Sequence, residues 1–367
     1  MQSGGGRVRD PYLMDGCKLK WHPDRVTDWL DGKVIAPIHI DVGLVKGCNI
    51  CCAYCFGRLQ GNKYKVGAKT IFPREALIKY MKDAGEAGVR SMGFIGEGEP
   101  TLNPYLYEAI EVATDNGIDC ALGTNGLAFA TDLAGERALK RLTWIRFNIS
   151  ACDDESYWHI HRSRDWARFL EVVKFCVYQK RQHNFKVTIG FQSVLIPENV
   201  GYMVELAKLG RKMGIDYHVI KQCSDTTASA LGIHDKLAQY KSYRPILEEA
   251  EAQSTEYYKV IVKWGMIENE GTRAYKQCLG VPFLLYSSGD GKLFPCGMFF
   301  DYRSDEFMLG DLTKQSFKDI IGSDKYHQVI EKVRALDVNQ CYSNCRTHGV
   351  NTYLWDVTHP PEHVNFV

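Results

Sequence analysis

Four cysteines fall within one short stretch of the chain, residues 43–61 (GLVKGCNICCAYCFGRLQG). Only one choice of three cysteines has three residues between the first two thiols and two residues between the last two. These cysteines are Cys48, Cys52 and Cys55. Three thiolates on one loop can hold three irons of a [4Fe–4S] cluster and leave the fourth iron open to a small chelating ligand. We therefore predict an incomplete iron–sulfur ligand set here, with Cys51 as a buried bystander.

A second candidate ligand set lies in the last third of the chain. Its members are Cys278, Cys296, Cys341 and Cys345. Four thiolates are enough to close a cluster that has no open iron. Zinc is the alternative metal, because structural zinc sites are usually built from two short pairs of ligands. A zinc site built from one close pair of each set would leave Cys48 without a metal to bind, so we favour iron–sulfur clusters.

The bulk composition limits the kind of protein. The chain has 367 residues, of which 45% are hydrophobic, enough for one large domain or two. Its 45 Lys and Arg against 44 Asp and Glu give a formal net charge of +1, which argues for neither nucleic acid nor an anionic membrane as a partner. The start, MQSGGGRVRD, has no apolar signal-peptide core. We expect a cytoplasmic protein with reduced thiols and no membrane span.

Short apolar runs alternate with segments of helical periodicity from residue 37 onward. The runs are 38–45, 91–95, 118–123, 144–151, 186–195 and 216–222, and the helical segments are 73–87, 104–116, 131–142, 165–181 and 199–213. Six strands that alternate with helices predict a parallel α/β fold, either a barrel or an open sheet. In a barrel, ligands bind at the carboxyl ends of the strands. The first cysteine loop follows the first of these strands.

The pattern changes after residue 225. Residues 233–265 look helical and polar, and residues 276–300 predict two short strands joined at Ser-Ser-Gly-Asp-Gly. A further helix is expected near 314–336. We divide the chain into an N-terminal extension (1–36), a barrel (37–230), a helical linker (231–270), a small cysteine-bearing domain (271–350) and a tail (351–367).

The pattern Cys48-x-x-x-Cys52-x-x-Cys55, with Tyr54 directly before the third cysteine, resembles the signature of the radical S-adenosylmethionine (SAM) superfamily. The resemblance extends over residues 37–225. It implies a partial (β/α)6 TIM-like barrel, a [4Fe–4S] cluster whose open iron binds SAM, and Tyr54 as a cofactor-binding residue.

The segment GEGEP, residues 96–100, is similar to the family's Gly-Gly-Glu-Pro element, which holds the methionine amino group of the cofactor. Gly98, Glu99 and Pro100 match that element, whereas Glu97 stands where the family often has glycine. The chemistry is consistent, because a cation needs an acceptor beside it and glycines let the backbone approach a ligand.

Two later segments extend the resemblance to the family. Asn125 lies in a Thr-Asn-Gly turn after the third strand, and Ser150, at the end of the fourth, matches a serine that contacts the cofactor. The arginine that pairs with the SAM carboxylate corresponds to Arg162, with Arg164 as the second candidate. Solvated charges at a helix start are the alternative for both arginines.

The four later cysteines resemble the auxiliary-cluster extension called SPASM in its full form and twitch in its shortened form. The full form carries more cysteines and usually two extra clusters, so four ligands imply the twitch type with one second [4Fe–4S] cluster. Cys341 and Cys345 have three residues between them, where two are common, and His348 lies close by as a substitute ligand.

The resemblance implies that an external one-electron donor such as flavodoxin or ferredoxin starts reductive cleavage of SAM. The resulting 5′-deoxyadenosyl radical removes a hydrogen atom from the substrate. An auxiliary cluster that accepts an electron would make the reaction a dehydrogenation, and a thiol that returns a hydrogen atom would make it an epimerisation. Cys223, directly after the sixth strand, is placed for that donor role, and a buried structural cysteine is the alternative.

The substrate class is suggested by what precedes the barrel. Many peptide maturases with such extensions carry a leader-binding domain of about 80 residues, for which the first 36 residues here are too few. We therefore expect a small polyhydroxylated substrate of the sugar, aminocyclitol or nucleoside type. A peptide or protein maturase is the first alternative. A non-catalytic iron–sulfur or zinc scaffold is the second, and the cofactor-binding elements Glu99, Ser150 and Arg162 argue against it.

Overall fold

The computed structural model describes residues 10–14, 16–58, 60 and 67–366. Its main sheet has ten strands in the order β12-β11-β10-β1-β4-β5-β6-β7-β8-β9. The eight strands from β10 to β9 pair in parallel, and β11 and β12 are added antiparallel at one edge. Their bounds are β1 His39–Val42, β4 Ser91–Phe94, β5 Asp119–Thr124, β6 Leu142–Asn148, β7 Thr188–Leu195, β8 Tyr217–Gln222, β9 Lys259–Val262, β10 Leu284–Ser287, β11 Lys292–Phe294 and β12 Gly310–Asp311.

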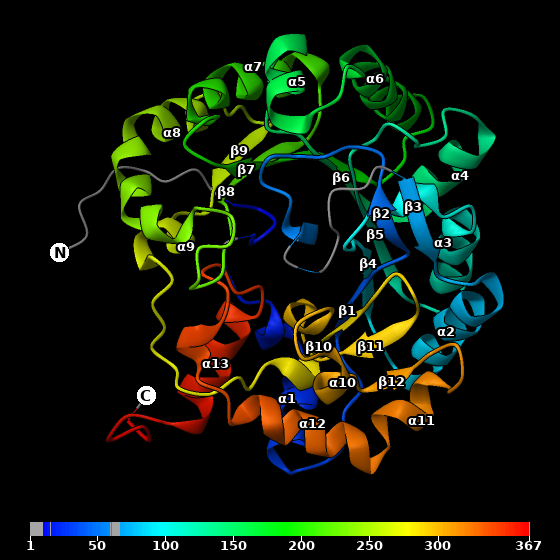
Figure 1. Cartoon of the computed structure of the whole chain (residues 1–367), viewed down its shortest axis with the longest axis vertical. Coiled ribbons are helices and arrows are strands. Elements are labelled where there is room, and N and C mark those ends of the chain that lie inside the picture. Colours follow the sequence, from blue (N-terminus) through cyan, green and yellow to red (C-terminus); the bar gives the residue numbers. More distant parts are fainter. Residues whose placement is uncertain (1–9, 15, 59, 61–66, 367) are drawn as a thin grey trace.

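Helices α2 to α8 lie around the outside of this curved sheet (Figure 1). The helices are α1 Pro23–Leu30, α2 Arg74–Ala87, α3 Leu106–Asp115, α4 Leu133–Arg141, α5 Asp154–His161, α6 Trp166–Gln182, α7 Met203–Met213, α8 Arg244–Glu251, α9 Trp264–Asn269, α10 Ser304–Phe307, α11 Phe317–Ile321, α12 Asp324–Arg334 and α13 His348–Thr358. Among these described helices, none has the length and apolar composition that crossing a bilayer requires. The predicted parallel α/β fold is confirmed.

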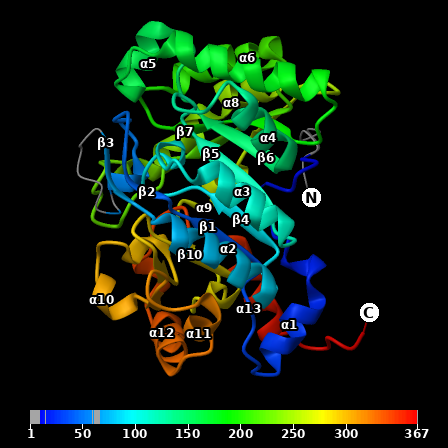
Figure 2. The ribbon, with the colours of Figure 1, turned by 90° about the vertical axis from the view of Figure 1, so that its right-hand side faces the viewer.

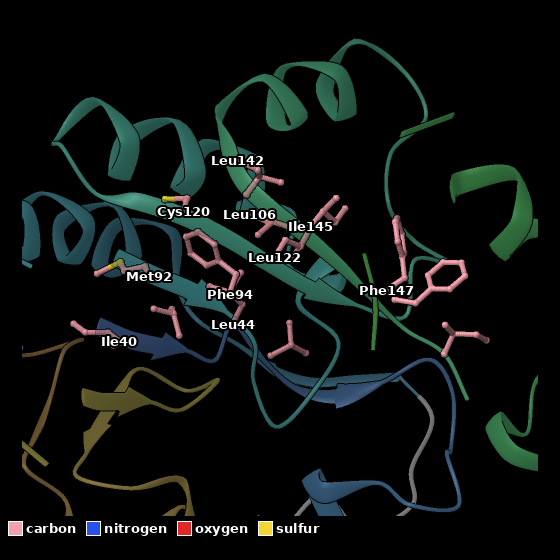
Figure 3. Close-up of a cluster of buried hydrophobic side chains, with 14 of the residues drawn as sticks. Ile40, Leu44, Met92, Phe94, Leu106, Cys120, Leu122, Leu142, Ile145 and Phe147 are labelled. Carbon is pink, nitrogen blue, oxygen red and sulfur yellow. The ribbon is translucent and has the colours of Figure 1, made fainter. Parts of the chain in front are cut away.

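Side chains alternate between the two faces of each central strand, as the pleat requires. Phe94 of β4 and Ile145 of β6 point toward the helices, pack with Leu106 of α3, and are fully buried (Figure 3). The intervening positions face the barrel axis, and on β6 they carry Arg146 and Asn148, which keep partial access to water. The outer face of the sheet therefore forms the core, while its inner face is polar.

The expected first strand, 38–45, is divided into two. β1 ends at Val42, and a new strand, β2 (Val45–Cys48), leaves the main sheet to pair antiparallel with β3 (Gly67–Ile71). The break occurs at Gly43, where an added Cβ would lie 2.7 Å from the carbonyl oxygen of Ser287. This separate ribbon carries the first cysteine away from the sheet and over the end of the barrel.

The parallel sheet is also longer than the six strands expected from the sequence. Within the segment 231–270, expected to be a helical linker, α8 is followed by β9, which pairs with β8 and extends one edge of the sheet. β9 is only four residues long and lies between polar segments, so its pattern is too short to identify in the sequence. At the other edge, β10 pairs in parallel with β1.

The C-terminal elements are thus continuous with the barrel through the shared sheet. The two expected strands of 276–300 are present as the antiparallel pair β10 and β11. In Figure 2, α10 to α13 gather with α1 at one end of the molecule, opposite α5 and α6. This arrangement brings the two cysteine segments together, because the rings of Phe56, after Cys55, and Tyr342, after Cys341, meet with centroids 4.7 Å apart.

Candidate active site

The first cysteine loop starts at the end of β2 and is fastened to the end of α5. The N–H groups of Cys51 and Ala53 donate hydrogen bonds to the carbonyl oxygens of His161 and Ile160, at 3.3 and 2.9 Å. Burial raises the pKa of the Cys52 thiol, and so do its nearest thiols, those of Cys55, Cys48 and Cys51. The predicted ligands therefore lie together. Cys51, expected to be buried, is partly exposed, because it lies on a loop at the barrel end.

His161 connects this loop to the end of β6. Its Nε2 accepts a hydrogen bond from the Ser150 N–H at 3.0 Å, so the ring proton is on Nδ1, which lies 3.1 Å from the Cys52 sulfur. Burial lowers the pKa of His161 to about 3, which keeps the ring neutral. His161 therefore donates a hydrogen bond to Cys52.

Glu99 joins the turn after β4 to the turn after β5. One carboxylate oxygen accepts hydrogen bonds from the Thr101 N–H (3.1 Å), the Thr101 hydroxyl (2.6 Å) and the Thr124 hydroxyl (2.6 Å). The other oxygen accepts from the Asn125 N–H at 2.8 Å. Asn125 Nδ2 in turn lies 3.6 Å from the Cys48 sulfur. The two motifs predicted to bind cofactor therefore meet beside the first cysteine.

The GEGEP turn packs backbone against backbone on the ribbon that carries the cysteines. A Cβ added to Gly98 would lie 2.1 Å from the Gly47 carbonyl oxygen and 2.4 Å from that of Val45. Pro100, which is buried, then starts a short 3-10 turn. Glycine is required at position 98 for steric reasons, and this contact holds the turn against the cysteine loop.

Tyr54 and Ser150 both contact His161. The Tyr54 ring meets the His161 ring edge-on, with centroids 5.8 Å apart. The Ser150 hydroxyl accepts a hydrogen bond from the Val194 N–H at 3.0 Å, which ties the ends of β6 and β7 together. Both residues are buried beside the cysteine loop.

The two candidate arginines are placed differently. Arg162, with a left-handed backbone (φ 57°), ends α5 and lines a cavity of ≈ 280 Å³ together with Tyr54 and Lys236. Arg164 packs on Trp158, 4.5 Å from the ring centroid, and its side chain is 66% exposed. The structure brings Arg162 next to the cysteine loop and leaves Arg164 on the outer surface.

The four later thiols also converge. Burial raises the pKa of Cys296, and the charges of Cys345, Cys278 and Cys341 raise it further, in that order. The surrounding groups supply hydrogen-bond donors: the Met298 N–H lies 3.5 Å from the Cys296 sulfur. The four thiols therefore lie within electrostatic range of one another, and four cysteines are enough to ligate a cluster fully. Among the described residues, no three Cys, His, Asp or Glu side chains are arranged to hold a metal ion.

His348, the expected substitute ligand, lies at the start of α13 and has partners of its own. Its Nδ1 is 3.3 Å from the Tyr275 hydroxyl, and the two rings are tilted against each other with centroids 5.5 Å apart. Burial raises the pKa of Tyr275, and the charge of Cys345 raises it further, so Tyr275 is near both His348 and the Cys345 thiol.

Cys223 follows β8 at its carboxyl end and is buried. Burial raises the pKa of its thiol to about 12, and the charge of Asp225 adds to this effect. Lys221 and Cys55 are also among its electrostatic neighbours. The thiol is therefore protonated near neutral pH.

Polar side chains on the inner faces of β6 to β8 form a connected group that the sequence analysis missed. Arg146 donates through Nε to the Tyr217 hydroxyl and through Nη1 to Gln192 Oε1, both at 3.0 Å. Gln192 Nε2 donates to Asn148 Oδ1 at 2.8 Å. The available signal was a charged or amide residue at alternate positions of otherwise apolar strands.

A second polar group crosses from β1 to the C-terminal domain. Asp41, on the inner face of β1, is paired with Arg346, whose Nη2 lies 2.9 Å from Asp41 Oδ1, and with His39 Nε2 at 3.0 Å. Although Asp41 is buried, Arg346 and His39 keep its pKa below the usual value. Arg346 directly follows Cys345, so this pair connects the auxiliary ligand loop to the barrel wall.

Comparison with known families agrees with this arrangement. The model of the radical SAM superfamily matches residues 42–210, and the model of the iron–sulfur cluster-binding domain called SPASM matches residues 284–347. The chain belongs to the radical SAM superfamily and carries a C-terminal SPASM domain. A radical SAM domain binds a [4Fe–4S] cluster and SAM, and a SPASM domain binds auxiliary iron–sulfur clusters. The two convergent thiol sets fit these groups.

Curated relatives of this radical SAM enzyme differ in activity. It is 28% identical to an S-adenosylmethionine-dependent nucleotide dehydratase of Flammeovirga pacifica, over 36% of this chain and 45% of the relative. It is 22% identical to an AdoMet-dependent heme synthase of Methanosarcina barkeri, over 78% of this chain and 82% of the relative. The chain thus spans less than half the length of the dehydratase.

Solved structures share the fold. SuiB of Streptococcus suis bound to S-adenosylmethionine superposes with a TM-score of 0.65 at 13% identity, covering 93% of this chain and 79% of SuiB. The enzyme anSMEcpe with bound AdoMet gives a TM-score of 0.57 at 18% identity, covering 82% and 81% of the two chains. At these identities the likeness concerns the fold alone.

Proposed function

We propose that this radical SAM enzyme abstracts a hydrogen atom from a small polyhydroxylated molecule, of the sugar, aminocyclitol or nucleoside type, and dehydrogenates it. The observation that carries the proposal is the hydrogen-bonding inner surface of the barrel on β6 to β8. Arg146, Gln192 and Asn148 form a chain of donors and acceptors there. Such a surface suits the hydroxyl groups of a substrate, because each hydroxyl group both donates and accepts a hydrogen bond.

Different residues at the barrel end would hold the cluster and SAM. Cys48, Cys52 and Cys55 would ligate the cluster, and Gly98, Glu99, Asn125 and Ser150 would shape the site for SAM. Arg162 and Tyr54 would border it from the side of the ≈ 280 Å³ cavity. When bound, the cluster and SAM supply a one-electron cleavage that yields a 5′-deoxyadenosyl radical, while the protein positions the substrate and excludes water.

Dehydrogenation is favoured over epimerisation by the auxiliary site. Converting an alcohol carbon to a carbonyl releases one hydrogen atom to the radical, then one electron and one proton. The four convergent thiols of the C-terminal domain would hold a cluster that takes the electron, and the proton leaves to solvent or a nearby base. Epimerisation would instead require a thiol that returns a hydrogen atom, and Cys223 is the residue placed for it.

The proposal is tested with anaerobically reconstituted enzyme. We expect about eight irons per chain and release of 5′-deoxyadenosine when the reduced enzyme meets SAM. Sugars, aminocyclitols and nucleosides are then screened for a matching increase in 5′-deoxyadenosine and for a carbonyl product. Iron near four per chain, or no 5′-deoxyadenosine, would contradict the proposal.

The Cys223→Ala variant separates the two outcomes. A dehydrogenase keeps its product in this variant, whereas an epimerase loses it, and only an epimerase incorporates deuterium from D2O into the product carbon. Peptide modification is the alternative substrate class. It would be favoured if a peptide, and none of the small molecules, raised the formation of 5′-deoxyadenosine.

A further inference from the structure

Two cations face the barrel axis with no counterion among the described residues. Arg146, on β6, donates hydrogen bonds to the neutral Tyr217 hydroxyl and Gln192 amide, and its guanidinium lies 4.3 Å from the Trp144 ring centroid; none of these described partners carries a negative charge. Lys221, on β8, forms neither a hydrogen bond nor an ion pair with any described residue. Both side chains are half-buried within a wall of parallel strands.

The charges around Lys221 are mostly of the same sign. Its electrostatic neighbours are Lys263, Arg146 and Arg346, and, on the negative side, the thiol of Cys223, two positions along the chain. The Arg346 charge is compensated by Asp41, which lies 2.9 Å from it. The described cations around Lys221 therefore outnumber the anions, although the whole chain has a formal net charge of only +1.

Enclosing cations in a protein interior without an anionic partner is unfavourable, because neutral hydrogen-bond partners replace only part of the lost hydration and leave the charge uncompensated. Such an arrangement is maintained where a ligand supplies the missing charge, and a guanidinium with free N–H groups suits an oxyanion. We propose that the barrel interior binds an oxyanion group of the substrate, a carboxylate or a phosphate, between Arg146 and Lys221. This inference rests on the proposed function for placing the substrate inside the barrel, and it adds that the polyol is acidic.

The experiment compares binding of matched neutral and anionic polyols to the reconstituted enzyme with SAM present. The probes are glucose, gluconate and glucose 6-phosphate, and the signals are calorimetric heat and the fluorescence of Trp144, whose ring lies 4.3 Å from the Arg146 guanidinium. We expect at least one anion to bind roughly tenfold or more tightly than glucose at low salt, with a preference that falls as salt rises. The two anions distinguish a carboxylate from a phosphate.

Variants assign the binding to the two cations. Lys221→Gln and Arg146→Gln should each reduce the anion preference about tenfold, whereas Lys221→Arg should retain part of it. Lys174→Gln, on the exposed side of α6, is the matched control and should change nothing. Iron content and thermal midpoint are measured for each variant, so that loss of folding is recognised.

The outcomes separate this inference from the proposed function. Equal binding of glucose and both anions, or an unchanged preference in both Gln variants, overturns the oxyanion site even if 5′-deoxyadenosine is formed. Conversely, an anion preference that depends on Arg146 and Lys221 supports the site even if no probe is dehydrogenated. Absence of SAM cleavage would count against the proposed function alone.

Discussion

At the scale of single residues, the contact between His161 and Cys52 is the least expected feature of the candidate active site. The Nδ1–H of a neutral, buried imidazole points at the sulfur from 3.1 Å. Hydrogen bonds to cluster-ligating sulfurs raise the reduction potential, because they stabilise the extra negative charge of the reduced cluster. His161 is therefore a positioning residue whose effect is expected on potential as well as on geometry.

Replacing His161 by phenylalanine should lower the midpoint potential of the SAM-binding cluster. Phenylalanine fills a similar volume but has no N–H to donate. The measurement is a redox titration followed by electron paramagnetic resonance, and His161→Asn serves as a variant that retains a donor. An unchanged potential in the phenylalanine variant, with normal iron content, would assign His161 to packing alone.

The charge state of Lys221 should couple ligand binding to pH. Burial, and then the neighbouring Lys263, Arg146 and Arg346, lower its pKa to about 7. The free enzyme is therefore partly deprotonated at Lys221 above pH 7, and an anion, which favours the charged form, must draw in a proton. We expect anion affinity to fall as pH rises from 7 to 9.

The proton uptake is measured at pH 8 by calorimetry in buffers of different ionisation enthalpy. It should disappear in Lys221→Gln. Identical apparent heats in all buffers for the unmodified enzyme would show that Lys221 does not titrate on binding.

At the scale of elements, the site depends on a ribbon and a turn that touch through their backbones. β2 leaves the main sheet after Gly43 and carries Cys48, while the GEGEP turn presses Gly98 against Val45 and Gly47. Motif residues separated by fifty positions in the sequence are joined by this contact. Gly98 is thus needed because the backbones of the turn and of β2 meet there, whether or not the glycine also contacts a ligand.

Gly98→Ala should destabilise this junction. Its Cβ would lie 2.1 Å from a backbone oxygen, and overpacking of this kind typically costs about 1–3 kcal/mol. We expect a lower thermal midpoint and weaker SAM binding, measured by scanning calorimetry and equilibrium dialysis. The control is Gly201→Ala, where no heavy atom lies within 4 Å of the added Cβ. Equal behaviour of the two variants would contradict the tight packing at Gly98.

At the scale of the whole molecule, the C-terminal domain is an extension of the barrel rather than a tethered unit. β10 pairs with β1, Asp41 pairs with Arg346, and the Phe56 and Tyr342 rings meet with centroids 4.7 Å apart. Phe56 follows the third cysteine of one ligand set, and Tyr342 lies between two cysteines of the other. The two cysteine segments are therefore parts of one packed structure.

Arg346→Gln should loosen this connection. It leaves the buried Asp41 carboxylate without its main cation, and the half-exposed arginine limits the cost to about 1–3 kcal/mol. Arg74→Gln, which breaks an exposed pair with Glu108, should cost at most about 1 kcal/mol. Chemical denaturation at neutral pH measures both variants.

The ion pair of Asp41 with Arg346 also makes the free energy of unfolding depend on pH. Asp41 has a lowered pKa in the folded protein, so its contribution to the unfolding free energy is complete above its unfolded pKa of about 4. The contribution is lost as pH falls through the folded value. The stability difference between the unmodified enzyme and Arg346→Gln should therefore shrink below pH 4, and a constant difference would contradict the ion pair.

The sequence by itself determined the parallel α/β fold, the three-cysteine register and the second set of four thiols. These features depend on local periodicity and on exact spacing, which are visible along the chain. The identity of the family also followed from such short motifs.

Only the tertiary structure decided the rest. The contacts of His161 with Cys52, the separation of Arg162 from Arg164, the added strand β9, and the unpaired charges of Arg146 and Lys221 all join residues that are distant in sequence or depend on which face of a strand points inward. A single charged residue in a short strand has no distinctive sequence pattern. Its role can be recognised only once the sheet curves and the inward faces of several strands line the same interior.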